Sequence, residues 1–229
     1  MSNPEVVPIG LGFVRAFLVR GRRDLLVDTG TPGSAPRLRA ALARLGTGLE
    51  RLSLVVITHG HLDHFGGLGG IAGSLGCPVA VHRADADVLR TGRQRPSTPV
   101  GPLLTAILRI APGARAGGAA LSGFEPGVLV DGPLDLAPYG VDGTVESTPG
   151  HTAGSVSVFL AGGEVIVGDA LRGAIGLPAS PRWPFVVEDF EENRRSVARV
   201  LERRPSRLWT SHGGPLEAAA ARRFAGRGG

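Results

Sequence analysis

Short runs of apolar residues alternate along the chain with longer runs in which apolar residues recur at a helical period. The first two short runs, residues 13–19 and 25–27, are separated by a polar stretch, which predicts an antiparallel hairpin. Residues 36–45 follow a helical pattern that stops at Gly46, as is typical of a helix C-terminus. Residues 54–57 are all apolar but too few for a helix, so we expect a strand that is buried on both faces.

The same alternation continues through the rest of the chain. It predicts strands over 79–81, 128–130, 144–147, 156–160, 165–167 and 208–210, and helices over 84–89, 188–203 and 216–224. The helix 188–203 has the clearest pattern, with Val197 and Val200 on one side and acidic residues at its start, where the helix dipole favours them. Because no repeat or linker interrupts the chain, we expect one domain over 1–229 with a frayed tail at 225–229.

The segment 91–127 differs from its surroundings. It is rich in Pro, Gly, Arg and Ala and contains one apolar island at 103–110. Long connections of this kind often form lids or binding loops. A solvated insertion without a role is the other interpretation, and the sequence leaves both open.

The composition argues against several classes of function. All 25 basic residues are arginine, and they are scattered rather than gathered into the stripe that nucleic-acid binding needs, so the net charge of +5 does not indicate such a partner. No apolar run approaches the roughly 18 residues of a membrane span. The first residues lack the pattern of a secretory signal, and the single cysteine cannot form an internal disulfide. We therefore expect a cytoplasmic protein without a nucleic-acid or membrane partner, in an oligomeric state that the sequence leaves open.

The main cluster of polar residues directly follows the predicted strand 54–57. It reads Thr-His-Gly-His-Leu-Asp-His over residues 58–64. Residues two apart on an extended segment point the same way, so His59 and His61 can converge on one ion, and a helix that begins inside the motif would turn Asp63 and His64 toward the same point. Packing does not explain such a cluster, because imidazoles and a carboxylate at the end of a buried strand need partners.

Three further polar residues follow predicted strands later in the chain. His151 lies in a glycine-containing turn, Asp169 lies just past the strand 165–167, and His212 lies just past the strand 208–210. Sites in sheet-based folds assemble at such strand ends. We therefore expect these residues to join the cluster at 58–64 in a metal site.

The pattern His-x-His-x-Asp-His, followed by a distant His, Asp and His, resembles the metallo-β-lactamase superfamily, and in particular its glyoxalase II and lactonase branch. Asp28-Thr29-Gly30 and the run from His151 to Ser155 also resemble elements of this family, and the likeness spans residues 13–212. The resemblance implies an α/β fold, a four-layer αβ/βα sandwich with the metal site at one edge.

The resemblance also implies a complete ligand set for two metal ions. His59, His61 and His151 would hold the first ion, Asp63, His64 and His212 the second, and Asp169 would bridge the two. Nitrogen and carboxylate ligands without a thiolate suit two zinc ions, and iron and manganese stay open. A hydroxide between the ions would be the nucleophile, and Asp63 would orient it and pass its proton to the leaving group.

The resemblance implies hydrolysis of an ester, lactone or thioester bond of a small molecule. Asp169 argues against antibiotic hydrolysis, since the β-lactamases that the chain resembles lack a bridging aspartate. The absence of lysine departs from the glutathione site of glyoxalase II, and Arg172 lies near the position where acyl-homoserine lactonases have a tyrosine. A mononuclear iron persulfide dioxygenase, which would use His59, His61 and Asp169, stays open as an alternative. A phosphodiesterase or RNA-processing hydrolase is a weaker one, because no basic arm for RNA is evident.

Other residues have plainer interpretations. Asp28 either braces the metal loops through hydrogen bonds or is simply structural. His82 is expected to be a hydrogen-bonded structural histidine, and Cys77 a packed thiol. Arg172, Arg182 and Trp183 lie where the loops after Asp169 could line a pocket, although surface loop residues are the commoner case.

Overall fold

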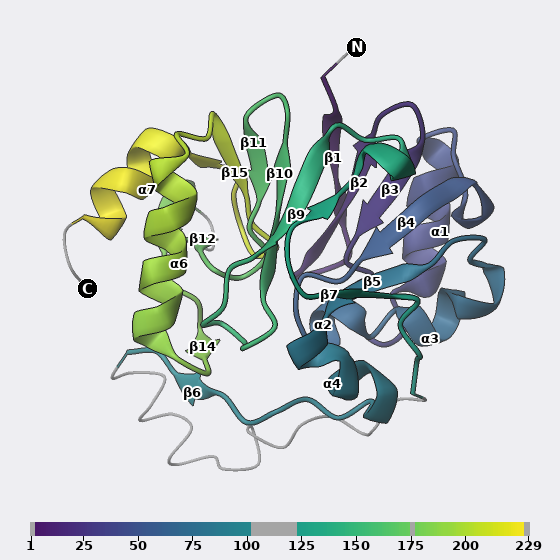
Figure 1. Ribbon diagram of the computed structural model, residues 1–229, viewed down its shortest axis with the longest axis horizontal. Helices are drawn as coiled ribbons and strands as arrows, with labels where there is room; N and C mark the ends of the chain where they lie inside the picture. The colour runs from purple at the N-terminus through teal and green to yellow at the C-terminus, as the bar shows by residue number, and fades with distance from the viewer. Residues whose placement is uncertain (1–2, 102–122, 175–176, 227–229) are drawn as a thin grey trace.

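In the computed structural model, which describes residues 3–101, 123–174 and 177–226, two six-stranded sheets pack face to face between helices (Figure 1). Helices α1 to α4 cover the outer face of the first sheet, and α6 and α7 cover the outer face of the second. This is the four-layer αβ/βα sandwich that the sequence predicts.

The first sheet combines an antiparallel half with a parallel half. Its strands, in spatial order, are β1 (Glu5–Gly10), β2 (Arg15–Arg20), β3 (Asp24–Val27), β4 (Leu52–Val56), β5 (Val79–His82) and β7 (Val128–Val130). β1 to β3 are antiparallel neighbours, and β3, β4, β5 and β7 run parallel. Every residue of β4 is buried, as expected for a central strand with both faces covered.

The second sheet is mostly antiparallel. Its order is β16 (Leu216–Glu217), β15 (Arg207–Trp209), β11 (Glu164–Ile166), β10 (Val156–Leu160), β9 (Gly143–Ser147) and β8 (Leu134–Asp135). Two short pairs lie outside the main sheets, β12 (Arg172–Ala174) with β13 (Leu177–Arg182), and β14 (Val186–Val187) with β6 (Thr98–Pro99).

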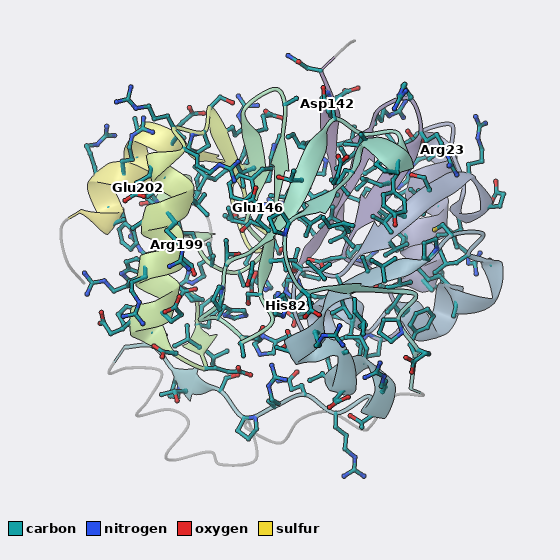
Figure 2. All side chains as sticks on the ribbon, in the orientation of Figure 1. Arg23, His82, Asp142, Glu146, Arg199 and Glu202 are labelled. Atoms are coloured by element: carbon teal, nitrogen blue, oxygen red, sulfur yellow. The ribbon has the colours of Figure 1, made fainter. Side chains whose placement is uncertain are left out.

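The helices enclose the sheets on both sides. They are α1 (Ala35–Arg44), α2 (Leu62–Phe65), α3 (Leu68–Ile71), α4 (Ala86–Thr91), α6 (Phe190–Glu202) and α7 (Ala218–Ala225), with 3-10 turns at η1 (Leu49–Arg51), η2 (Ala72–Ser74), η3 (Arg83–Asp85) and η5 (Ala137–Tyr139). Figure 2 shows Arg199 and Glu202 on α6, in the outer layer. Among the described residues, no helix is long and apolar enough to cross a membrane.

Alternation of side chains along the strands divides the core into three parts. In β2, Phe17 and Val19 belong to the cluster between the two sheets, whereas Ala16 and Leu18 belong to the cluster beneath α1. A third cluster lies between the second sheet and α6 and includes Val197. The sheets therefore share an apolar interior, and polar side chains inside the sandwich concentrate where the strands end.

The structure confirms most predicted elements and corrects others. β2 and β3 form the predicted hairpin, and the helix predicted over 188–203 is α6, which begins after Asp189. β1 was not predicted, because Pro8 and Gly10 break its apolar pattern; an edge strand tolerates proline. The first residues of the helix predicted over 216–224 are β16 instead, since Leu216 pairs with Leu208 at the sheet edge.

One further predicted helix has different bounds in the structure, and two other predicted segments lie partly or wholly outside the described residues. The helix predicted over 84–89 is a 3-10 turn followed by α4, which runs on to Thr91. Ala225 of the predicted frayed tail belongs to α7, and residues 227–229 lie outside the described residues. The apolar island at 103–110 also lies outside them.

Candidate metal centre

The seven predicted ligand residues meet at one end of the two sheets. The run 58–64 connects β4 to α2, His151 follows β9, Asp169 follows β11 and His212 follows β15. Figure 1 shows α2 at the same end of the sandwich as β14 and β6, and Figure 2 shows Arg23 and Asp142 at the opposite end. Six of the seven side chains are buried, and the seventh, Asp63, is partly exposed. The site therefore takes ligands from both sheets.

Three histidine nitrogens converge in the first group. The Nε2 atom of His151 lies 3.0 Å from Nε2 of His59 and 3.0 Å from Nδ1 of His61. All three side chains are buried. Such a triangle of imidazole nitrogens can hold one metal ion.

The second group combines carboxylates with histidines. The Nε2 atom of His212 lies 3.2 Å from Oδ2 of Asp63 and 3.2 Å from Oδ2 of Asp169. Nε2 of His64 lies 3.7 Å and 3.6 Å from the same two oxygens. Oδ2 of Asp169 also lies 3.7 Å from Nε2 of His151, so this carboxylate lies between the two groups.

Two buried atoms of the cluster make no hydrogen bond with any described residue. Nε2 of His64 and Oδ1 of Asp169 are inaccessible to solvent and make no hydrogen bond within the described part of the chain. Buried polar atoms are nearly always partnered, and an unpartnered one needs an explanation. A cation at this position would satisfy both atoms, and nitrogen with carboxylate donors suits zinc, iron or manganese. The residues present therefore fit a metal centre.

The outer nitrogen of each histidine is held by an acceptor in the protein. In the first group, Nδ1 of His59 contacts Thr58 Oγ1 (3.0 Å), Nε2 of His61 contacts Ser97 Oγ (3.2 Å) and Nδ1 of His151 contacts the Val186 carbonyl (2.9 Å). In the second group, Nδ1 of His64 contacts Asp28 Oδ2 (2.8 Å) and Nδ1 of His212 contacts the Phe13 carbonyl (3.0 Å). A proton on each outer nitrogen leaves the lone pair of the inner nitrogen directed into the cluster, as a metal ligand requires.

The arrangement has a counterpart among known proteins. The sequence profile of the metallo-β-lactamase superfamily matches residues 9–222, which is most of the chain. The chain belongs to the metallo-β-lactamase superfamily. It is accordingly an enzyme, a metallo-hydrolase with His and Asp groups that can bind metal.

Curated relatives and solved structures agree with this assignment. The chain is 28% identical over 203 residues to a probable metallo-hydrolase of Methanocaldococcus jannaschii, covering 86% of each protein. It is 33% identical over 206 residues to the human metallo-β-lactamase domain-containing protein 1, covering 87% of this chain and 62% of that protein.

Two solved structures illustrate the likeness in fold. A metallo-β-lactamase family protein of Thermus thermophilus matches 98% of this chain and 78% of its own, with a TM-score of 0.67 at 24% identity. The subclass B3 metallo-β-lactamase of Bradyrhizobium japonicum matches 98% of this chain and 88% of its own, with a TM-score of 0.69 at 17% identity. At these identities the structures show a shared fold and no more.

Burial and charge give the two groups of this metallo-hydrolase opposite protonation. Burial lowers the pKa of His59 and His61, and it lowers the pKa of His151 to about 3. Burial also acts to lower the pKa of His212, but Asp169 and Asp63 outweigh it and raise that pKa to about 10. The first group is therefore neutral and ready to donate lone pairs, whereas the second carries protons where a metal cation would bind.

Aromatic side chains border the site on the His212 side. Phe13 stacks on the His212 ring at 5.6 Å between centroids, and Phe185 meets the same ring edge-on at 6.3 Å. Of the large hydrophobic side chains that the structure describes, these two are the exposed ones, at 69% and 40%. The Arg172 guanidinium lies 3.8 Å from the centre of the Phe185 ring. The sequence pointed to Arg172 but not to the two phenylalanines, because a lone aromatic residue in a loop carries no local signal.

The other residues singled out in the sequence either support the candidate metal centre through hydrogen bonds or lie away from it. Asp28 braces the site, since its carboxylate accepts hydrogen bonds from His64 and from Thr58. His82 accepts a hydrogen bond from the Ala84 amide, as expected of a structural histidine. Trp183 packs against Phe190 and Phe224 and lines a hollow between α6 and α7.

Proposed function

We propose that this enzyme hydrolyses an ester, lactone or thioester bond of a small molecule at a dinuclear zinc centre. The residues that would hold the first ion are His59, His61 and His151, those for the second are Asp63, His64 and His212, and Asp169 would bridge them. The observation that carries the proposal is the position of Asp169, whose Oδ2 atom lies within 3.7 Å of a nitrogen in each group.

The chemistry divides between the metal ions and the side chains. When bound, the ions would polarise the carbonyl of the substrate and lower the pKa of a water molecule. Asp63 is the most exposed member of the cluster, at 26% of its side chain, so it can contact both solvent and substrate. Its carboxylate is ionised, because His64 and His212 outweigh the effect of burial and lower its pKa to about 2. An ionised carboxylate at this place can orient the attacking water and carry its proton to the leaving group.

The exposed aromatic side chains at the entrance of the site favour a substrate with an apolar part. Phe13 and Phe185 expose their rings beside His212, and Arg172 stacks on one of them. Exposed aromatic rings around a few convergent polar groups are typical of small-molecule sites. An acyl chain or ring would bury these faces while its carbonyl lies at the metal centre.

The proposal is tested by replacing the bridging carboxylate. The variant Asp169→Ala should lose at least about a hundredfold in kcat/KM on whichever member of an ester, lactone and thioester panel the parent hydrolyses, because both groups lose a shared ligand. Asp142→Ala is the matched control, since Asp142 lies at the opposite end of the sandwich (Figure 2). Full activity of Asp169→Ala, or no hydrolysis of any of the three bond types by the zinc-loaded parent, would contradict the proposal.

A further inference from the structure

A fully buried carboxylate, Asp85, lies behind the first metal group. It ends the 3-10 turn η3, directly after β5, and none of its surface is exposed. Its Oδ2 atom accepts two hydrogen bonds, one from the Gly60 amide at 2.7 Å and one from the Thr152 hydroxyl at 2.7 Å. Gly60 separates His59 from His61, and Thr152 follows His151. One oxygen atom therefore holds both loops that supply the three converging histidines.

Two glycines allow this carboxylate to approach the loops. A Cβ atom on Gly60 would lie 3.2 Å from the Asp85 carboxyl carbon, and one on Gly154 would lie 2.4 Å from it. Neither glycine has a left-handed backbone, so close approach rather than unusual φ requires them. The Asp85 carboxylate occupies the space beside Gly60 and Gly154, which explains why both positions need glycine.

Arg95 forms an ion pair with Asp85 and so places a positive charge beside the buried carboxylate. Its guanidinium bonds to the other carboxylate oxygen of Asp85 and, through Nε, to Oε1 of Glu188 at 2.8 Å. Glu188 in turn accepts a hydrogen bond from the Ala153 amide at 2.7 Å, in the same loop as His151. Arg95 therefore lies between two carboxylates, each of which holds the loop of His151.

The same stretch of chain also reaches the ligands directly. Ser97, two residues beyond Arg95, is the hydrogen-bond partner of His61. β6 follows at once and pairs with β14, whose Val186 carbonyl holds His151. The described start of the 91–127 segment thus contacts both the loop of His59 and His61 and the loop of His151. For residues 95–99, this supports a role at the site rather than a solvated insertion.

We propose that Asp85 is a positioning residue for the metal centre, and that Arg95 is the counter-charge through which the segment 95–99 sets the spacing of the two histidine loops. A buried charge without a partner is strongly unfavourable, so loss of Arg95 should displace Asp85 and with it Gly60 and Thr152. The inference rests on the proposed metal-binding role of His59, His61 and His151.

The test is the zinc affinity of the full chain, measured by competition with a chelator. Asp85→Asn keeps the shape of the side chain but turns a donor toward Arg95, and Arg95→Gln removes the counter-charge. Each variant should bind zinc at least about tenfold more weakly than the parent, as is usual when an outer support of a metal ligand is lost. The double variant should lose no more than the larger single loss, because both changes break one interaction.

Arg90→Gln is the matched control. Arg90 lies five residues before Arg95, its side chain is exposed to a similar degree (37% against 34%), and it also bridges two carboxylates, Asp87 and Glu125, but on the surface. Its loss should leave zinc affinity unchanged. The absorption spectrum of the cobalt-loaded protein provides a second readout, which should change in Asp85→Asn and not in Arg90→Gln, because the spectrum reports ligand geometry.

The outcomes separate this inference from the proposed function. If the parent binds zinc tightly and both Asp85→Asn and Arg95→Gln bind it within twofold of the parent, Asp85 is only structural and the inference is wrong. If Asp85→Asn does not fold, Arg95→Gln alone decides the matter. If the parent itself binds no zinc, the proposed function fails and this inference fails with it.

Discussion

Asp28 illustrates how a single residue supports several ligands at once. Its backbone is left-handed, with φ of 62°, a conformation that aspartate adopts more readily than most residues. This conformation turns the carboxylate toward Nδ1 of His64 and toward both the amide and hydroxyl of Thr58, which in turn partners His59. One strained residue therefore orients one histidine in each metal group.

The protonation of the histidines makes the stability of the metal-free protein depend on pH in two opposite ways. The pKa of His151 is lowered from 6.5 to about 3, so its contribution to stability is complete above pH 6.5 and is lost as the pH falls toward 3. The pKa of His212 is raised to about 10, so its contribution is complete below pH 6.5 and is lost as the pH rises through 10.

We therefore expect the unfolding temperature of the chelator-treated protein to be highest near pH 6.5 and to fall on both sides. Excess zinc should remove the decline on the alkaline side, because a metal ion takes the place of the proton on His212. Thermal unfolding from about pH 4 to about pH 10, with and without zinc, measures this. A steady rise of the metal-free unfolding temperature up to pH 10 would contradict the pKa of His212.

The sequence identified the residues that converge at the candidate metal centre more readily than the residues that support them. His59 and His61 lie two apart after an apolar run, and this spacing is visible without any tertiary structure. Asp85 is 67 residues from Thr152, and the contact depends on how β5 and β9 are placed in two different sheets. No local pattern records such a contact. The support from Asp85 therefore had to be found in the structure, whereas Asp28 was already a candidate from the sequence.

At the scale of elements, α6 connects the loops of two ligands to the outer layer. Asn193 donates a hydrogen bond to the Ala170 carbonyl at 3.0 Å, and Ser196 donates one to the Pro149 carbonyl at 2.7 Å. These carbonyls lie next to Asp169 and just before His151. The helix was predicted from the spacing of its apolar residues. Asn193 and Ser196 lie on the same buried side, but as polar residues they did not contribute to that prediction. The pattern thus located the helix and not its role.

The close contact of α6 with the His151 loop leads to a prediction for Gly150. Its φ is 127°, and a Cβ atom there would lie 2.1 Å from the Asn193 amide nitrogen. Gly150→Ala should lower the free energy of unfolding by more than the roughly 1–2 kcal/mol of a left-handed alanine. It should also weaken zinc binding, since His151 must move with the loop. Chemical unfolding and chelator competition measure the two effects.

Gly163 offers the control for backbone strain alone. Its φ is 81°, but a Cβ atom there would meet Ser206 only at 3.4 Å, an ordinary contact. Gly163→Ala should therefore cost about 1–2 kcal/mol of stability and leave zinc affinity unchanged. Equal losses of stability in the two variants, with equal zinc affinity, would show that the contact between α6 and the His151 loop is unimportant.

In the molecule as a whole, the candidate metal centre joins the two halves of the sandwich. The cluster at 59–64 follows β4 of the first sheet, whereas His151, Asp169 and His212 follow strands of the second. The resemblance of the ligand pattern to a known family was enough to predict the four layers. Composition and periodicity alone gave only alternating strands and helices, because sheet order depends on long-range pairing such as β11 with β15. We expect this edge of the sandwich to hold two metal ions.

The number of metal ions can be measured directly, by elemental analysis of protein purified without added metal, expressed per chain. We expect about two zinc ions per chain in the parent protein, and about one in Asp169→Ala, which lacks the shared ligand. One iron ion per chain in the parent, with no second metal, would contradict the dinuclear zinc centre and point to oxygen chemistry at a single iron instead.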